Sequence, residues 1–125
     1  MITLIDTSAW IEYLRPHGNS TVADAVEEVL LTGNAGLCPL IELELRVGSR
    51  SKTEDKQLSE LFNSLIQLPM SDKVWNYAYH LSTTLRRSGH TIPATDIAIY
   101  SCSKVNNAKL LANDKHYLLI ANNIK

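Results

Sequence analysis

The chain has 125 residues, of which 45% are hydrophobic and 20% are charged, a length and composition that suit one domain with one sizeable core. Its formal net charge of −1 excludes the strongly basic composition of an obligate nucleic-acid coat protein. No apolar run approaches the roughly 20 residues that span a bilayer, and the first residues lack the basic start of a secretory signal. We therefore expect a single domain over residues 1–125, cytoplasmic and without a membrane segment.

Short apolar segments alternate with segments whose apolar residues recur at helical spacing. In chain order we expect a strand at 1–5, helices at 7–14 and 20–32, a strand at 35–38, a helix at 39–47, a helix after Ser51, a strand at 66–68, helices at 72–88 and 93–104, a strand at 109–112 and a helix from 115. Gly33 suits a C-terminal cap, and Pro39 and Pro93 suit helix starts. Such alternation predicts a three-layer α/β/α fold around a short, central parallel sheet.

The two cysteines, Cys38 and Cys102, do not form a C-x-x-C pair, and each lies in an apolar stretch. We expect both to be buried thiols that pack as small hydrophobic side chains.

Four of the thirteen acidic residues lie at positions that a solvated helix face does not explain. Asp6 follows the first strand, Glu44 lies inside an apolar helix, Asp96 lies in the first turn after Pro93, and Asp114 follows the last strand. Ligands of an open parallel sheet bind beyond the carboxyl ends of its strands, which Asp6 and Asp114 reach directly. We expect the four carboxylates to gather at this edge.

Carboxylates gathered in one place repel one another, and a divalent cation removes that cost. Mg²⁺ prefers oxygen ligands, and Mn²⁺ can substitute for it. Because no His or Cys stands at ligand spacing around these acids, the sequence disfavours zinc.

These motifs carry a resemblance to a known family. Asp-Thr-Ser-Ala-Trp at residues 6–10 resembles the start of the PIN-domain ribonucleases, especially the short toxins of the VapC type. The segments at 44–48, 93–98 and 111–114 are similar to the three later motifs of that family, in the same order. The resemblance spans nearly the whole chain. It implies a PIN-like fold, metal-dependent endonucleolytic cleavage of RNA and a VapB-like antitoxin as partner.

Carried over by motif, the catalytic acids are Asp6, Glu44, Asp96 and Asp114, and Asp6 and Asp96 hold Mg²⁺, with Glu44 and Asp114 as further candidate ligands. Glu42 is the rival of Glu44, which is preferred for its distance to the following glycine.

Two positions depart from the family pattern. Ala112 stands where the family often has Thr, and His116 stands where it often has a further acid. We expect the His116 imidazole on the surface rather than at the site.

Substrate contacts are predicted for Ser8, Arg46 and Arg50. Ser8 can donate to a carboxylate or to a water at the site. The alternative is that Thr7 or Ser8 only caps the first helix. Arg46 and Arg50 lie four residues apart on the helix that carries Glu44, and we expect them to contact phosphate.

A homodimer is also expected. Trp75 and Tyr79 share one face of a long helix beside the inward stripe of Val74, Ala78, Leu81 and Leu85. Two other functions stay open: a non-catalytic RNA- or protein-binding module with the same fold, and, more weakly, a phosphoacceptor domain of the receiver type.

Overall fold

A computed structural model describes residues 1–124 of the chain. Over these residues the chain forms four strands and seven helices. They are β1 (Thr3–Ile5), α1 (Thr7–Leu14), α2 (Ser20–Thr32), β2 (Ala35–Leu37), α3 (Pro39–Val47), α4 (Lys52–Asn63), β3 (Ile66–Gln67), α5 (Asp72–Arg87), α6 (Ala94–Val105), β4 (Lys109–Leu111) and α7 (Lys115–Asn123).

The strands form one parallel sheet in the order β3-β2-β1-β4. Thr3 of β1 pairs with Ala35 of β2 on one side and with Lys109 of β4 on the other. Parallel strands that are hydrogen-bonded neighbours end at the same edge of a sheet. The residues that follow β1 and β4 are therefore brought together.

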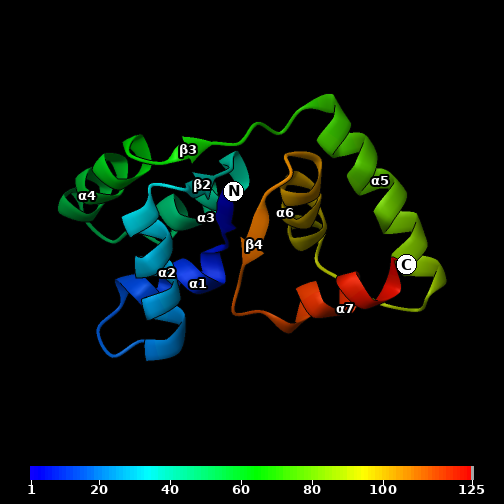
Figure 1. The fold of residues 1–125 in the computed structure, drawn as a ribbon, viewed down its shortest axis with the longest axis horizontal. Helices are drawn as coiled ribbons and strands as arrows, with labels where there is room; N and C mark the ends of the chain where they lie inside the picture. Colours follow the sequence, from blue (N-terminus) through cyan, green and yellow to red (C-terminus); the bar gives the residue numbers. More distant parts are fainter. Residues whose placement is uncertain (125) are drawn as a thin grey trace.

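The helices cover the sheet in two groups (Figure 1). In this view α1 to α4 lie below and to the left of β1 to β3, and α5, α6 and α7 lie to the right of β4. Helix α1 packs on α2, and α6 packs on α5, β4 and α7. The prediction of a three-layer α/β/α fold with a parallel sheet is confirmed.

The core is aliphatic and is formed by the strands and the inward faces of the helices. Leu4 and Ile5 of β1 and Leu37 of β2 are fully buried. The predicted inward stripe of α5 is confirmed, because its four members are all buried: Val74, Ala78, Leu81 and Leu85.

The local signals in the sequence place the helix ends well. Ser51 caps α4 by accepting from the Glu54 N–H, and Gly33 ends α2 in a left-handed conformation with φ of 76°. Pro93 stands at the N-cap of α6. The strands are one or two residues shorter than predicted, β1 at its start and the other three at their ends.

Cys38 and Cys102 are both fully buried free thiols, as predicted. No helix within residues 1–124 is long and apolar enough to cross a membrane.

Candidate active site

Two of the acidic residues begin helices directly after neighbouring strands. Asp6 is the N-cap of α1, and its carboxylate accepts from the Ser8 N–H at 3.0 Å. Asp114 is the N-cap of α7, and its carboxylate accepts from the His116 N–H at 2.9 Å. The alternative that Thr7 or Ser8 only caps α1 is wrong, because the extended backbone at Asp6 already presents a carboxylate to the free N–H groups.

The Ser8 side chain joins the two strand ends. Its hydroxyl donates to Asp6 Oδ2 at 2.6 Å and accepts from the Asn113 N–H at 2.8 Å. Ser8 therefore holds the Asp6 carboxylate in place and ties the start of α1 to the segment that follows β4.

Asp96 reaches the same edge from the first turn of α6. The Tyr117 hydroxyl lies 2.8 Å from Asp6 Oδ1 and 3.4 Å from Asp96 Oδ1, so one phenol bridges the two carboxylates. Tyr117 is buried, with 7% of its surface exposed. Sequence reasoning missed this residue; the available signal was its position three residues after Asp114, in the first turn of the last helix.

His116 completes a compact group with Asp96 and Asp114. Its Nδ1 lies 2.9 Å from Asp114 Oδ1 and 3.1 Å from Asp96 Oδ2. One ligand atom from each of the three residues lies within 4.8 Å of the others. The expectations that His116 is a surface imidazole and that no His lies at ligand distance are wrong, because α7 packs on α6 and the imidazole lies against Asp96 and Asp114.

Burial and mutual repulsion make Asp96 costly to ionise. Removal from water raises its pKa to about 6, with further contributions from the negative charges of Asp114 and Asp6. The pKa of Tyr117 is also raised, first by burial and then by the charge of Asp6. The Tyr117 hydroxyl therefore stays protonated and donates to the carboxylates.

Glu44 lies at the rim of this cluster rather than inside it. Its Oε1 accepts at 2.7 Å from the hydroxyl of Thr7, the residue that follows Asp6 in the chain. The rival Glu42 instead pairs with Arg46, with Nε and Oε2 2.9 Å apart. Of the two acids on α3, Glu44 is thus the one linked to the cluster.

The two predicted phosphate-binding arginines differ in their surroundings. Arg46 pairs with Glu42, donates to Ser59 and has its guanidinium 5.0 Å from the centre of the Phe62 ring. Arg50 has 87% of its side chain exposed and is 3.9 Å from the Glu54 carboxylate. Arg46 is held against α4. The expectation that Arg50 shares the helix of Glu44 is wrong, because α3 ends at Val47 and Arg50 lies beyond it, with an exposed side chain.

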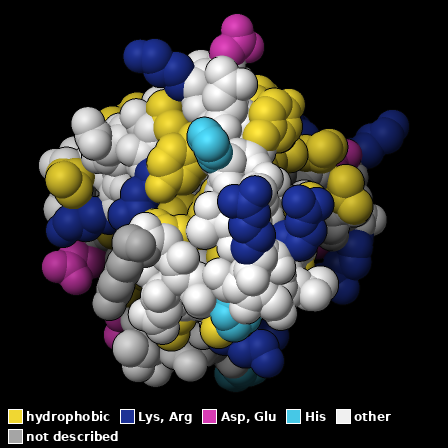
Figure 2. All heavy atoms as spheres, turned by 90° about the vertical axis from the view of Figure 1, so that its right-hand side faces the viewer, with side chains coloured by type: hydrophobic (Ala, Val, Ile, Leu, Met, Phe, Trp, Pro, Cys, Tyr) yellow, Lys and Arg dark blue, Asp and Glu magenta, His cyan; other side chains and the backbone are white. Residues whose placement is uncertain are grey.

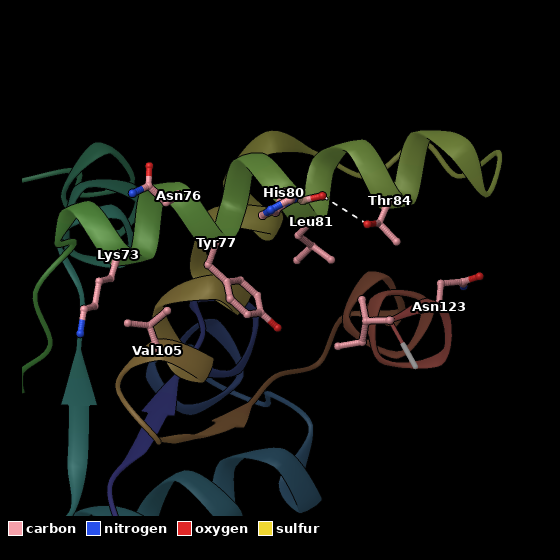
Figure 3. Close-up of a pocket in the computed structure, with 9 residues that line it drawn as sticks. Lys73, Asn76, Tyr77, His80, Leu81, Thr84, Val105 and Asn123 are labelled. Carbon is pink, nitrogen blue, oxygen red and sulfur yellow. Dashed lines mark hydrogen bonds between the residues drawn. The ribbon is translucent and has the colours of Figure 1, made fainter.

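A groove of about 680 Å³ lies away from the acids, between α5 and the ends of α6 and α7 (Figure 3). Tyr77 projects from α5 toward α7 in this view, and the Thr84 hydroxyl donates to the His80 carbonyl. None of its described lining residues carries a carboxylate. The groove therefore offers no carboxylate ligand to a cation among its described lining residues.

The donor set of the acidic cluster fits a divalent cation. Asp96, Asp114 and His116 converge, and Asp6 is joined to Asp96 through one phenol. The buried Nδ1 of His116 makes no hydrogen bond among the described residues, although it faces two carboxylates. An imidazole nitrogen and carboxylate oxygens together form an ordinary ligand set for such an ion.

The sequence model of one family, described as the PIN domain, matches residues 3–123. The chain belongs to the PIN-domain family. Among curated relatives, this PIN domain is 30% identical over 122 residues to the "VapC ribonuclease Mb1587" of Mycobacterium bovis, covering 94% of this chain and 90% of that protein. The "Ribonuclease VapC11" of Mycobacterium tuberculosis matches equally.

Solved structures agree with this family. The PIN domain superposes on VapBC2 of Rickettsia felis, solved with a promoter DNA fragment, with a TM-score of 0.75 and 25% identity, covering 92% of this chain and 89% of that one. FitAcB of Neisseria gonorrhoeae gives a TM-score of 0.77 at 23% identity, covering 97% and 94%. The second likeness concerns the fold alone.

Proposed function

We propose that this PIN domain is an endoribonuclease of the VapC type, the toxin of a type II toxin–antitoxin pair, and that it hydrolyses RNA phosphodiester bonds with Mg²⁺. The observation that carries the proposal is the convergence of Asp6, Asp96 and Asp114 at one edge of the sheet. The relatives named as ribonucleases, 30% identical over most of the chain, support the same activity.

Asp6, Asp96, Asp114 and His116 are the residues that would hold the cation. When bound, a divalent cation lowers the pKa of a water and neutralises negative charge on the phosphate. Mg²⁺ suits the carboxylate oxygens, and the His116 nitrogen makes Mn²⁺ a good substitute, since imidazole suits transition metals better than Mg²⁺.

The residues around the carboxylates orient them. Ser8 and Tyr117 donate to opposite oxygens of Asp6, so this carboxylate cannot rotate freely. We assign Glu44, whose carboxylate accepts from the Thr7 hydroxyl, to accepting a proton from the water that attacks the phosphate.

Substrate contacts are proposed for the two arginines that follow Glu44 in the chain, Arg46 and Arg50. Arg50 is exposed and can pair with a phosphate of RNA, whereas Arg46 must first leave Glu42. The Ser8 hydroxyl already donates to Asp6 and accepts from the Asn113 N–H, so we assign Ser8 to orienting Asp6 rather than to binding substrate.

A VapB-like antitoxin is the proposed protein partner. The VapBC2 structure is that of a complex, and its likeness to this chain supports a similar assembly. We propose that a basic side chain of the antitoxin reaches Asp6 and Asp96 and excludes the cation. Both partners and the RNA would meet in the cytoplasm.

The test compares wild type, Asp96→Asn and the control Asp24→Asn, an exposed residue of α2, on a panel of tRNA, rRNA and mRNA transcripts. Because Asp96→Asn removes a ligand charge but keeps the shape, we expect cleavage to fall on the order of 100-fold or more. The control should cleave normally with Mg²⁺ or Mn²⁺, and EDTA should abolish its activity. Wild-type cleavage by Asp96→Asn, or activity that survives EDTA, would contradict the proposal.

A further inference from the structure

A second groove, of about 730 Å³, begins at the acidic cluster and follows the edge of the sheet. It runs between α6, the edge strand β4 and α7, which are neighbours in Figure 1. Asp114 and Tyr117, two residues of the candidate site, belong to its lining. The groove therefore adjoins the site at Asp114 and Tyr117, whereas Asp6, Asp96 and His116 do not line it.

Three lysines give this groove its charge. Lys104 lies near the end of α6, Lys109 begins β4 and Lys115 begins α7, and all three are exposed. Asp114 is the only acidic residue among the lining residues in the described chain. None of the three ammonium groups lies within 4.0 Å of a described carboxylate, so their charges are available to a ligand.

The floor of the groove is apolar and aromatic. Tyr100 and Tyr117 are buried in it, and Leu110 lines it from β4. The Lys104 ammonium lies 5.4 Å from the centre of the Tyr100 ring, which holds this lysine at the groove. A groove with basic walls and an apolar floor suits a single strand of nucleic acid, whose backbone is anionic and whose bases are flat and apolar on their faces.

We propose that this lysine groove, lined by Lys104, Lys109 and Lys115, binds the RNA strand on one side of the bond that is cleaved. The inference rests on the proposed ribonuclease function and adds the path of the substrate to it. Charge complementarity favours RNA over a basic antitoxin segment at this groove. Carboxylates at the site repel a phosphate backbone, so cations beside them are needed to hold it.

The test measures binding and not cleavage, in the Asp96→Asn background. A fluorescein-labelled single-stranded RNA of mixed sequence is titrated with Mg²⁺ present, and anisotropy gives the Kd at several KCl concentrations. Each phosphate contact to a single strand contributes about 0.7 to the slope of log K against log salt. Replacing the three lysines with alanine should reduce this slope by about 2 and raise the Kd on the order of tenfold.

The matched control replaces Lys56, Lys73 and Arg87, three exposed cations on α4 and α5, and removes the same charge elsewhere. For this control variant, the slope of log K against log salt should fall by less than half of the decrease expected for the triple lysine variant. Circular dichroism checks that both triple variants stay folded.

Equal slopes for the two triple variants would overturn the groove as the RNA path. If the triple lysine variant binds RNA normally but self-associates, the lysines serve only to keep the sheet edge from pairing, and the inference is equally overturned. Absence of RNA binding by every variant, including the parent, would instead contradict the proposed function.

Discussion

At the scale of single residues, hydrogen bonds from the backbone stabilise the negative charge of two acids at the site but not that of the third. Asp6 and Asp114 cap helices, so N–H groups and the helix dipole favour their negative charges. Asp96 has no such cap bond from its own helix and lies between the other two acids. The free-energy cost of gathering negative charges at the site therefore falls mainly on the ionisation of Asp96.

This cost predicts a pH-dependent stability of the metal-free protein. The pKa of Asp96 is raised from 3.8 to about 6 in the folded state, so the folded state binds its proton more tightly than the unfolded state does. The contribution of Asp96 to the free energy of unfolding should then be highest below pH 4 and fall as the pH rises to about 6. At roughly 1.4 kcal/mol per pK unit, and with the partial exposure of the site, the loss is about 2 kcal/mol.

Asp96→Asn removes the ionisable group and should remove this pH dependence. Thermal unfolding in EDTA should show the variant more stable than the wild type by roughly 8 °C at pH 8, and by a much smaller difference at pH 4.5. Saturating Mg²⁺ should stabilise the wild type more than the variant. A Tm difference that stays constant from pH 4.5 to 8 would contradict the assignment of this cost to Asp96.

At the scale of elements, the turn between α1 and α2 is fastened to the end of α1. The buried Glu12 carboxylate accepts from Arg15 at 2.7 Å and from the Asn19 N–H at 2.9 Å. Gly18 packs against the same residue: a Cβ at Gly18 would lie 2.0 Å from the Glu12 carbonyl oxygen. The turn thus requires glycine because the two backbones approach closely.

Gly18→Ala should therefore destabilise the fold by about 1–3 kcal/mol, since the turn must move away from α1. Gly48→Ala is the matched control, because its Cβ would meet no atom closer than 3.6 Å and its φ is −80°. Urea unfolding measures both. A Gly18→Ala protein as stable as the control would show that the turn tolerates the shift.

At the scale of the whole molecule, the outer face of α5 is an unusual surface. Trp75 and Tyr79 are 36% and 63% exposed and stack with ring centres 6.5 Å apart. Figure 2 looks at the side of the molecule that carries α5, where hydrophobic and basic side chains lie side by side and acidic ones lie at the margin. Exposed aromatic side chains are frequent anchors of protein interfaces.

We predict a homodimer that uses this face of α5. Sedimentation at micromolar concentration should show a dimer for the wild type, and Trp75→Ala with Tyr79→Ala should raise the dimer Kd by tenfold or more. Leu31→Ala, which removes an apolar side chain that is 79% exposed on α2, is the control and should leave the dimer unchanged. A wild-type chain that sediments as a monomer would refute the prediction.

Local patterns in the sequence were sufficient to predict the helices and strands and to find the acidic residues that follow β1 and β4. Apolar spacing along α5 and turn signals such as Gly33 and Pro93 act over a few residues, so a linear reading finds them. The alternation of strands and helices then determines a parallel sheet, and with it the edge where Asp6 and Asp114 meet.

Only the tertiary structure decided which other side chains join that edge. Tyr117 and His116 reach Asp96 across about 20 residues of chain, through the packing of α7 on α6, and no short-range pattern encodes that contact. Packing likewise holds Arg46 against Phe62 rather than leaving it free for phosphate. The spacing of apolar residues predicts which face of a helix is buried. The angle between two packed helices depends on all the side chains between them, and that angle determines which residues meet at the site.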